Sequence, residues 1–185
     1  KYNAILMIDE AHAFCSIDDE CAGMSDGLDV DIVTATFGKA LGSFGAFATG
    51  NKTIINFLIN KARSFIFSTS IPPLNIAWTK WLLTEKKDYI YEQKKKLARL
   101  SIAVHKYLKS NDINTVSESH IIPVVIGDDE KTVKVAEQLR NLGFFVLPIR
   151  PPTVPKNTSR LRLSLTADME FESVRTLIDY VRNEI

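Results

Sequence analysis

The sequence predicts an α/β protein made of part of a large, mainly parallel sheet with covering helices and a small carboxyl-terminal α/β domain. Residues 4–8 (AILMI) form an uninterrupted apolar run, as in parallel strands that helices cover on both faces. Residues 72 to about 109 have helical periodicity, and beyond residue 111 short apolar segments alternate with helical ones. These three observations predict two lobes joined by a helix.

The composition excludes several classes of protein. The 185 residues are 45% hydrophobic and carry a net charge of +1, so the chain can bury a core but has no basic field for nucleic acid. No apolar run approaches the roughly 20 residues of a membrane span, and the first residues lack a signal-peptide layout. We therefore expect a cytoplasmic protein with neither a nucleic-acid nor a membrane partner.

The two cysteines, Cys15 and Cys21, predict neither a disulfide framework nor a metal site. A disulfide-stabilised domain needs more cysteines, and a zinc site needs paired spacing that these two lack. We expect both thiols to be reduced and no metal to be bound.

The first lobe begins with strands whose order can be read along the chain. After the run at 4–8, we expect strands at 31–36 and 44–50, a helix at 52–62 and an extended segment at 65–70. A central parallel strand that begins almost at residue 1 needs neighbours from elsewhere. We therefore expect that a large amino-terminal portion lies outside this chain.

The helix from 72 to about 109 is predicted to begin at two prolines and to connect the lobes. Its apolar residues share one face at helical spacing: Leu97, Leu100, Val104 and Leu108. The predicted domains are residues 1–74 for the part of the large domain, 75–110 for the connecting helix and 111–185 for the small domain.

The small domain is predicted from alternating segments. Residues 120–126 and 144–147 are strand-like, and residues 131–142 form a helix. Residues 160–165 alternate polar and apolar side chains with a period of two, and residues 170–182 form a closing helix.

The most informative motif is TFGKALG at residues 36–42, preceded by Asp9 at the end of the first apolar run. A lysine between two glycines, with an upstream carboxylate, is the arrangement that a pyridoxal phosphate (PLP) enzyme needs. Lys39 would form the Schiff base, and Asp9 would keep the pyridine nitrogen protonated. Thr36 is placed to hydrogen-bond a phosphate or phenolic oxygen, and Gly38 would let the backbone turn toward the ligand.

Each of these residues also has an ordinary structural interpretation. Most lysines like Lys39 lie on the surface, and Asp9 could be a solvated strand end. In doubly wound sheets, however, ligands bind outside the carboxyl ends of strands, where Asp9 and His12 would both lie. We therefore favour the functional interpretation.

Residues 9–12 (DEAH) also match a helicase box, which would require a phosphate-binding G-x-x-x-x-G-K-[ST] loop. The chain has one Gly-Lys pair, at residues 38–39. Val33 replaces the first glycine of that loop, and Ala40 replaces its magnesium-binding hydroxyl. The helicase interpretation is excluded.

Taken together, these motifs resemble the carboxyl-terminal half of the α-oxoamine synthases of PLP fold type I. The resemblance implies that an amino acid is joined to an acyl-CoA or acyl-carrier-protein thioester with loss of carbon dioxide. It implies that Asp9 contacts the pyridine nitrogen, His12 the phenolic oxygen and Lys39 the cofactor aldehyde. Thr36 would also bind PLP.

The resemblance also implies a homodimer. Ser68 and Thr69, in the segment FSTSIPP, match the residues that reach the cofactor phosphate of the neighbouring subunit. The active site would then be shared across the interface.

The small domain carries the substrate end of the resemblance. The run IRPPTVP at 149–155 looks most like the biotin-pathway member, which condenses alanine with a pimeloyl thioester. Thr153 matches a substrate-contacting threonine, and Arg162 matches the arginine that binds the amino-acid carboxylate through its planar guanidinium. Arg160 lies on the same strand face and would support it.

The chain departs from the family at residues 15–17 (CSI), where a glycine-containing turn usually follows the histidine. The half of the enzyme that supplies the ring-stacking residue and much of the acyl-CoA channel is also absent from this sequence. Two alternatives stay open: another acyl-CoA condensing member of the family, or a piece that is inactive by itself.

Overall fold

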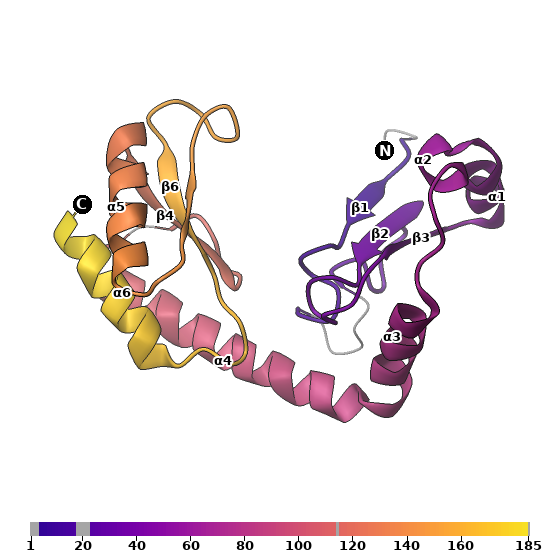
Figure 1. The fold of residues 1–185 in the computed structure, drawn as a ribbon, viewed down its shortest axis with the longest axis horizontal. Coiled ribbons are helices and arrows are strands. Elements are labelled where there is room, and N and C mark those ends of the chain that lie inside the picture. The colour runs from indigo at the N-terminus through magenta and orange to yellow at the C-terminus, as the bar shows by residue number, and fades with distance from the viewer. Residues whose placement is uncertain (1–3, 18–22, 114, 185) are drawn as a thin grey trace. The chain divides into compact units, whose positions relative to one another are not determined.

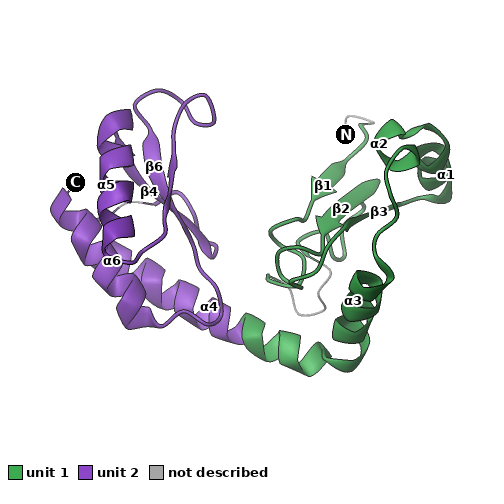
Figure 2. Ribbon diagram, in the orientation of Figure 1, with its two compact units in different colours: residues 1–94 green, residues 95–185 purple. Residues whose placement is uncertain are grey.

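The computed structural model describes residues 4–17, 23–113 and 115–184. The chain divides into two compact units, residues 1–94 and 95–185, and the boundary falls inside helix α4 (Lys87–Ser110) (Figure 2). Within the described residues, none of the helices combines the length and apolar character needed to cross a bilayer.

The sheet of the first unit has the order β1-β2-β3 (Figure 1). Strand β1 (Met7–Asp9) runs parallel to β2 (Ile32–Thr36), as predicted, and β3 (Ala46–Gly50) runs antiparallel to β2. Gly50 lies so close to the neighbouring strand that an added Cβ would stand 2.6 Å from the carbonyl oxygen of Asp31.

The expectation that residues 4–8 form a buried strand is wrong for this chain. Ile5 is 75% exposed and Met7 is 57% exposed. Only the end of the apolar run belongs to the parallel strand, which spans Met7–Asp9, and the described part of the chain leaves these side chains largely uncovered. Periodicity reports which side chains suit burial, and it does not report which segment covers them.

The helices of the first unit differ from the predictions at residues 65–70 and at residues 72–109. Helix α1 (Lys52–Lys61) is capped by Asn51, whose side chain accepts a hydrogen bond from the backbone of Ile54. The predicted extended segment at 65–70 is wrong in its first half, because α2 (Arg63–Ile66) forms local helical hydrogen bonds. Its aromatic side chains are exposed and pair with no strand, so their β-propensity has nothing to act through.

The single helix predicted for residues 72–109 is two helices. Helix α3 (Pro73–Glu85) ends at Lys86, whose φ of −122° and ψ of 24° depart from helical values, and α4 begins at the next residue. Pro73 occupies the first turn of α3, where its missing N–H costs nothing, as expected from the sequence.

The second unit contains an antiparallel sheet of order β4-β6-β5. The strands are β4 (Ile121–Gly127), β5 (Leu147–Ile149) and β6 (Ser159–Ser164). Strand β5 begins three residues later than predicted, because the backbone N–H of Phe144 still bonds to the carbonyl oxygen of Leu139 after the preceding helix.

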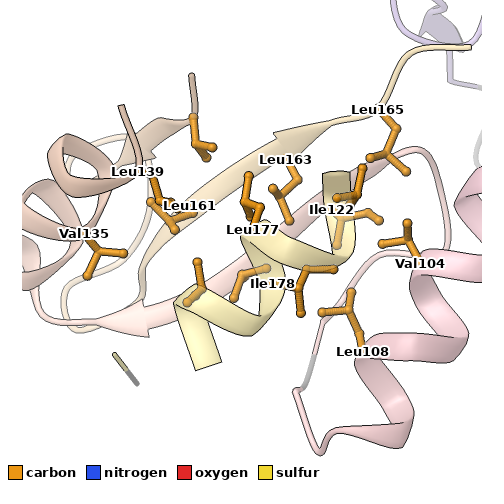
Figure 3. Packing of buried hydrophobic residues seen from close by; sticks show 14 of the residues in the cluster. Val104, Leu108, Ile122, Val135, Leu139, Leu161, Leu163, Leu165, Leu177 and Ile178 are labelled. Carbon is orange, nitrogen blue, oxygen red and sulfur yellow. The ribbon is translucent and has the colours of Figure 1, made fainter. Parts of the chain in front are cut away.

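Two helices accompany this sheet, α5 (Asp129–Asn141) and α6 (Phe171–Glu184), close to the predicted ranges. The buried core of the second unit joins both helices, the sheet and the end of α4, as Figure 3 shows. Its fully buried members include Val104, Leu108, Ile122, Leu139, Leu161 and Ile178. This core gives the second unit a rigid β6, on which Arg160 and Arg162 lie.

Candidate active site

Asp9 and Thr36 end two neighbouring parallel strands at the same edge of the first sheet (Figure 1). Asp9 pairs with Thr34, and Thr36 follows two residues later on β2. Lys39 comes three residues after Thr36. The parallel register therefore brings these predicted residues to one edge, which is where α/β sheets bind ligands.

The turn after β1 orients the carboxylate of Asp9. One oxygen, Oδ1, accepts a hydrogen bond from the backbone N–H of Ala11 at 2.8 Å. Asp9 itself is exposed, as is His12 in the same turn. Both side chains can therefore be reached by a ligand at this edge.

The same turn contains the expected departure from the family. Cys15 has a φ of 57°, in the left-handed region that favours glycine, and its side chain is buried. The backbone thus adopts a glycine-like conformation although the residue is a cysteine. Within the described residues this cysteine forms no disulfide, and Cys21 lies outside them.

The loop that bears Lys39 is closed by two backbone hydrogen bonds. Phe37 donates to the carbonyl oxygen of Gly45 and accepts from the N–H of Ser43, both at 2.9 Å. The left-handed residues of this loop are Gly42, at φ 55°, and Gly45, at φ 105°, while Gly38 lies in a bend directly after β2, where the turn is predicted. An added Cβ on Gly45 would also come within 2.5 Å of Ile71.

Thr36 has a buried hydroxyl that bears on cofactor binding. Its Oγ1 atom is buried and has no hydrogen-bond partner in the described part of the chain. A buried hydroxyl without a partner is unfavourable by about 1–3 kcal/mol. An acceptor such as a phosphate or phenolic oxygen would satisfy it, so this residue fits the cofactor that the motif predicts.

Glu10 is a residue at this edge whose role the sequence did not reveal. Its carboxyl group is 1% exposed and accepts a hydrogen bond from the backbone N–H of Ser25 at 2.6 Å. An added Cβ on Gly23 would lie 2.6 Å from the same carboxyl group. Glu10 thus fixes residues 23–25 beside the end of β1. The adjacent Asp9 is the more obvious acid in the motif, and no periodicity distinguishes the two.

Ser68 and Thr69 follow helix α2 and are both exposed. The hydroxyl of Ser68 donates to the carbonyl oxygen of Phe65 at 2.9 Å. Within the described residues no hydrogen bond or ion pair joins this pair to Asp9 or Lys39. The placement is compatible with a ligand on another subunit, which stays a prediction.

The predicted substrate residues Thr153 and Arg162 belong to the second unit. Along β6 the two arginines alternate with buried residues, so both lie on the same face, as predicted. Arg160 donates from Nε to the carbonyl oxygen of Thr158 at 2.9 Å, and Thr153 is exposed. Arg162 is half-buried and pairs with Pro123 on one side and Leu147 on the other.

The pKa of His120 is shifted by burial and by the charge of Arg162. Partial burial lowers the pKa of the His120 imidazole below its ordinary 6.5, and the positive charge of Arg162 lowers that pKa further. The imidazole is therefore held in its neutral form close to neutral pH.

Comparison with known proteins identifies the family. The family model described as aminotransferase class I and II matches residues 1–181. The chain belongs to the aminotransferase class I and II family. A relative from Pasteurella multocida, named putative 8-amino-7-oxononanoate synthase, is 42% identical over 181 residues. That match covers 94% of this chain and 46% of the relative, so the chain spans about half the length of its curated relatives.

Solved structures of family members confirm the fold. A crystal structure of 8-amino-7-oxononanoate synthase from Francisella tularensis matches 97% of this chain and 54% of its own, with a TM-score of 0.84 and 22% identity. A serine palmitoyltransferase variant from S. paucimobilis, with a bound PLP-myriocin aldimine, has a TM-score of 0.83 and 25% identity. That match covers 98% of this chain and 47% of the palmitoyltransferase. These matches confirm the resemblance to the α-oxoamine synthases that the motifs predicted.

Proposed function

We propose that this chain is part of a PLP-dependent acyltransferase that condenses an amino acid with an acyl thioester, with loss of carbon dioxide, to give an amino-ketone. One observation carries the proposal. Asp9 and Thr36 end adjacent parallel strands, and Lys39 follows in a closed loop at the same edge. The 42% identity to a putative 8-amino-7-oxononanoate synthase supports this type of chemistry.

Four residues of the first unit would hold the cofactor. Lys39 would bind its aldehyde carbon, Asp9 its pyridine nitrogen, His12 its phenolic oxygen, and the buried hydroxyl of Thr36 would donate to an oxygen of the group. Bound PLP supplies an electron sink for the charge that develops on the amino-acid α-carbon.

The chain's own residues would then bind, orient and move a proton. The guanidinium of Arg162 would hold the amino-acid carboxylate through two parallel hydrogen bonds, and Thr153 would contact the substrate. After the incoming amino group has displaced it from the aldehyde carbon, the amine of Lys39 would take the α-proton as general base. Its loop lies three residues beyond Thr36, and this proximity in the chain supports the role. The side chain of Asp9 would balance the charge of a protonated pyridine nitrogen.

The substrates proposed are alanine and a pimeloyl thioester, carried by coenzyme A or a carrier protein, in biotin synthesis. The support is the run at 149–155 together with the names of the similar proteins. The second candidate is another α-oxoamine synthase, of the 2-amino-3-ketobutyrate CoA ligase, 5-aminolevulinate synthase or serine palmitoyltransferase type. The structural match to a serine palmitoyltransferase supports this second candidate. The third candidate is that this chain is a piece that is inactive by itself.

We also propose a homodimer in which Ser68 and Thr69 bind the cofactor phosphate of the partner subunit. Both side chains are exposed beyond α2, and neighbouring apolar residues are exposed as well. Phe65 and Phe67 are 63% and 76% exposed, which is typical of a surface that a protein partner covers.

The substrate assignment is tested by spectral titration of the PLP-loaded protein with amino acids. The longest natural protein that contains this chain should respond to alanine at lower concentration than to glycine or serine. A preference for glycine would defeat the biotin-pathway assignment and favour the ketobutyrate or aminolevulinate type. No response to any amino acid would contradict the proposed chemistry as a whole.

A further inference from the structure

The loop that bears Lys39 is fastened to helix α3 by side chains. The hydroxyl of Thr79 donates to Oγ of Ser43 at 2.9 Å, and Ser43 in turn donates to the carbonyl oxygen of Asn75 at 3.1 Å. Thr79 is 7% exposed, so this short chain of hydrogen bonds is largely shielded from water. It holds the end of the loop four residues after Lys39.

A second bond reaches the loop closer to the lysine. The indole N–H of Trp78 donates to the carbonyl oxygen of Leu41 at 3.1 Å. The side chain of Leu41 is buried with Cys15, Leu82 and Ile90, so backbone and side chain of this residue are both fixed. Lys39 therefore lies between strand β2 on one side and two anchored residues on the other.

We propose that Trp78 and Thr79 are positioning residues that hold the Lys39 loop against α3. This inference rests on the proposed function, since it takes Lys39 as the reacting amine. Lys39 is itself exposed, so the direction of its side chain depends on the backbone that carries it. A lysine that must bind a ring and then reach an α-proton reacts fastest from a fixed backbone.

The chain provides a matched control on the same helix. The Trp81 ring lies tilted beside the Trp78 ring, with ring centroids 5.2 Å apart. Trp81 is 41% exposed, compared with 45% for Trp78. It has a cation–π contact with Lys86 and, within the described residues, no hydrogen bond to the Lys39 loop. Trp81→Phe thus removes an indole of similar exposure without removing a bond to the loop.

Hydrogen exchange tests the anchoring without any cofactor. In the full chain, Trp78→Phe and Thr79→Val should each speed amide exchange in residues 38–43 by about fivefold, the effect expected from one lost hydrogen bond. Exchange in α1, which belongs to the same unit, should not change, which excludes a general loss of stability of the first unit. Trp81→Phe should match the parent. Unchanged exchange in the loop for both variants would overturn the inference.

Covalent labelling connects the anchoring to the lysine. After PLP and borohydride treatment of the longest natural protein containing the chain, label on Lys39 relative to Lys52 should fall severalfold in Trp78→Phe and Thr79→Val. It should not fall in Trp81→Phe. Equal labelling of Lys39 in all four proteins would overturn the inference and leave the proposed function intact. Label in the parent on a lysine other than Lys39 would overturn both.

Discussion

Glu10 donates its backbone N–H to the carbonyl oxygen of Thr34 at 2.7 Å, directly after the paired residues Asp9 and Thr34. This bond extends the parallel ladder one residue beyond strand β1 and fixes the point at which the chain turns. The carboxylate of Asp9 is therefore presented at the same sheet edge as Thr36. Arg162, the proposed carboxylate ligand, lies on strand β6 of the second unit.

Arg162→Lys should weaken amino-acid binding by about 1–3 kcal/mol, because an ammonium group cannot reproduce two parallel hydrogen bonds to a carboxylate. Acyl-chain preference should hardly change. Spectral titration with alanine measures the effect. Arg160→Lys is the control, since Arg160 Nε already donates to the carbonyl oxygen of Thr158. A larger loss of binding for Arg160→Lys than for Arg162→Lys would mean that Arg160, and not Arg162, binds the carboxylate.

Ser68 and Thr69 should act on the partner subunit. A mixed dimer of one Lys39→Ala subunit and one Ser68→Ala/Thr69→Ala subunit should regain one working site of two, because each subunit supplies what the other lacks. Activity of the purified mixed dimer is compared with that of the two parent dimers. An inactive mixed dimer, with both parents folded, would mean that these residues serve their own chain.

Cys15→Gly should be more stable than Cys15→Ala by about 1 kcal/mol. Both variants lose the buried thiol, but alanine keeps a side chain at φ 57° while glycine adopts that conformation without strain. Urea unfolding of both variants gives the difference. The neighbouring Ala13, which is buried but is not among the left-handed residues, is the control.

At that control position the order should reverse, with Ala13→Gly less stable than the parent by about 0.5–1 kcal/mol or more. If glycine and alanine were equally stable at position 15, the left-handed conformation of Cys15 would not be a feature of the folded protein.

His120 should make stability depend on pH. Its folded-state pKa lies below the 6.5 of the unfolded chain, so the unfolded state binds more protons just below pH 6.5. The free energy of unfolding should be highest above pH 6.5 and should fall as the pH drops from 6.5 through the folded-state pKa. Urea unfolding across this range in the parent and in His120→Gln tests this. An identical slope in both proteins would contradict it.

Much of the fold was predictable because its signals are local. The parallel pair β1 and β2, the alternation along β6 and the closing helix α6 each appear in the spacing of apolar residues. The break at Lys86 and the helix at 63–66 were missed because the spacing of apolar residues marks neither of them. Local hydrogen bonds, rather than periodicity, decide their conformation.

The candidate site was predictable where a motif specifies the chemistry, as for Asp9 and Lys39. Its supports were not, because Glu10, Trp78 and Thr79 act through partners that lie 15 or more residues away in the sequence. The left-handed Gly42 and Gly45 likewise follow from how the loop closes.

The most direct test of the account is to find the lysine that PLP modifies. The longest natural protein containing this chain is loaded with PLP, reduced with borohydride, digested and mapped by mass spectrometry. The account predicts label on Lys39, with Lys39→Ala losing both the label and all turnover, because no other group can replace a covalent amine. Label on Lys52 or Lys61 instead, or turnover that survives in Lys39→Ala, would contradict it.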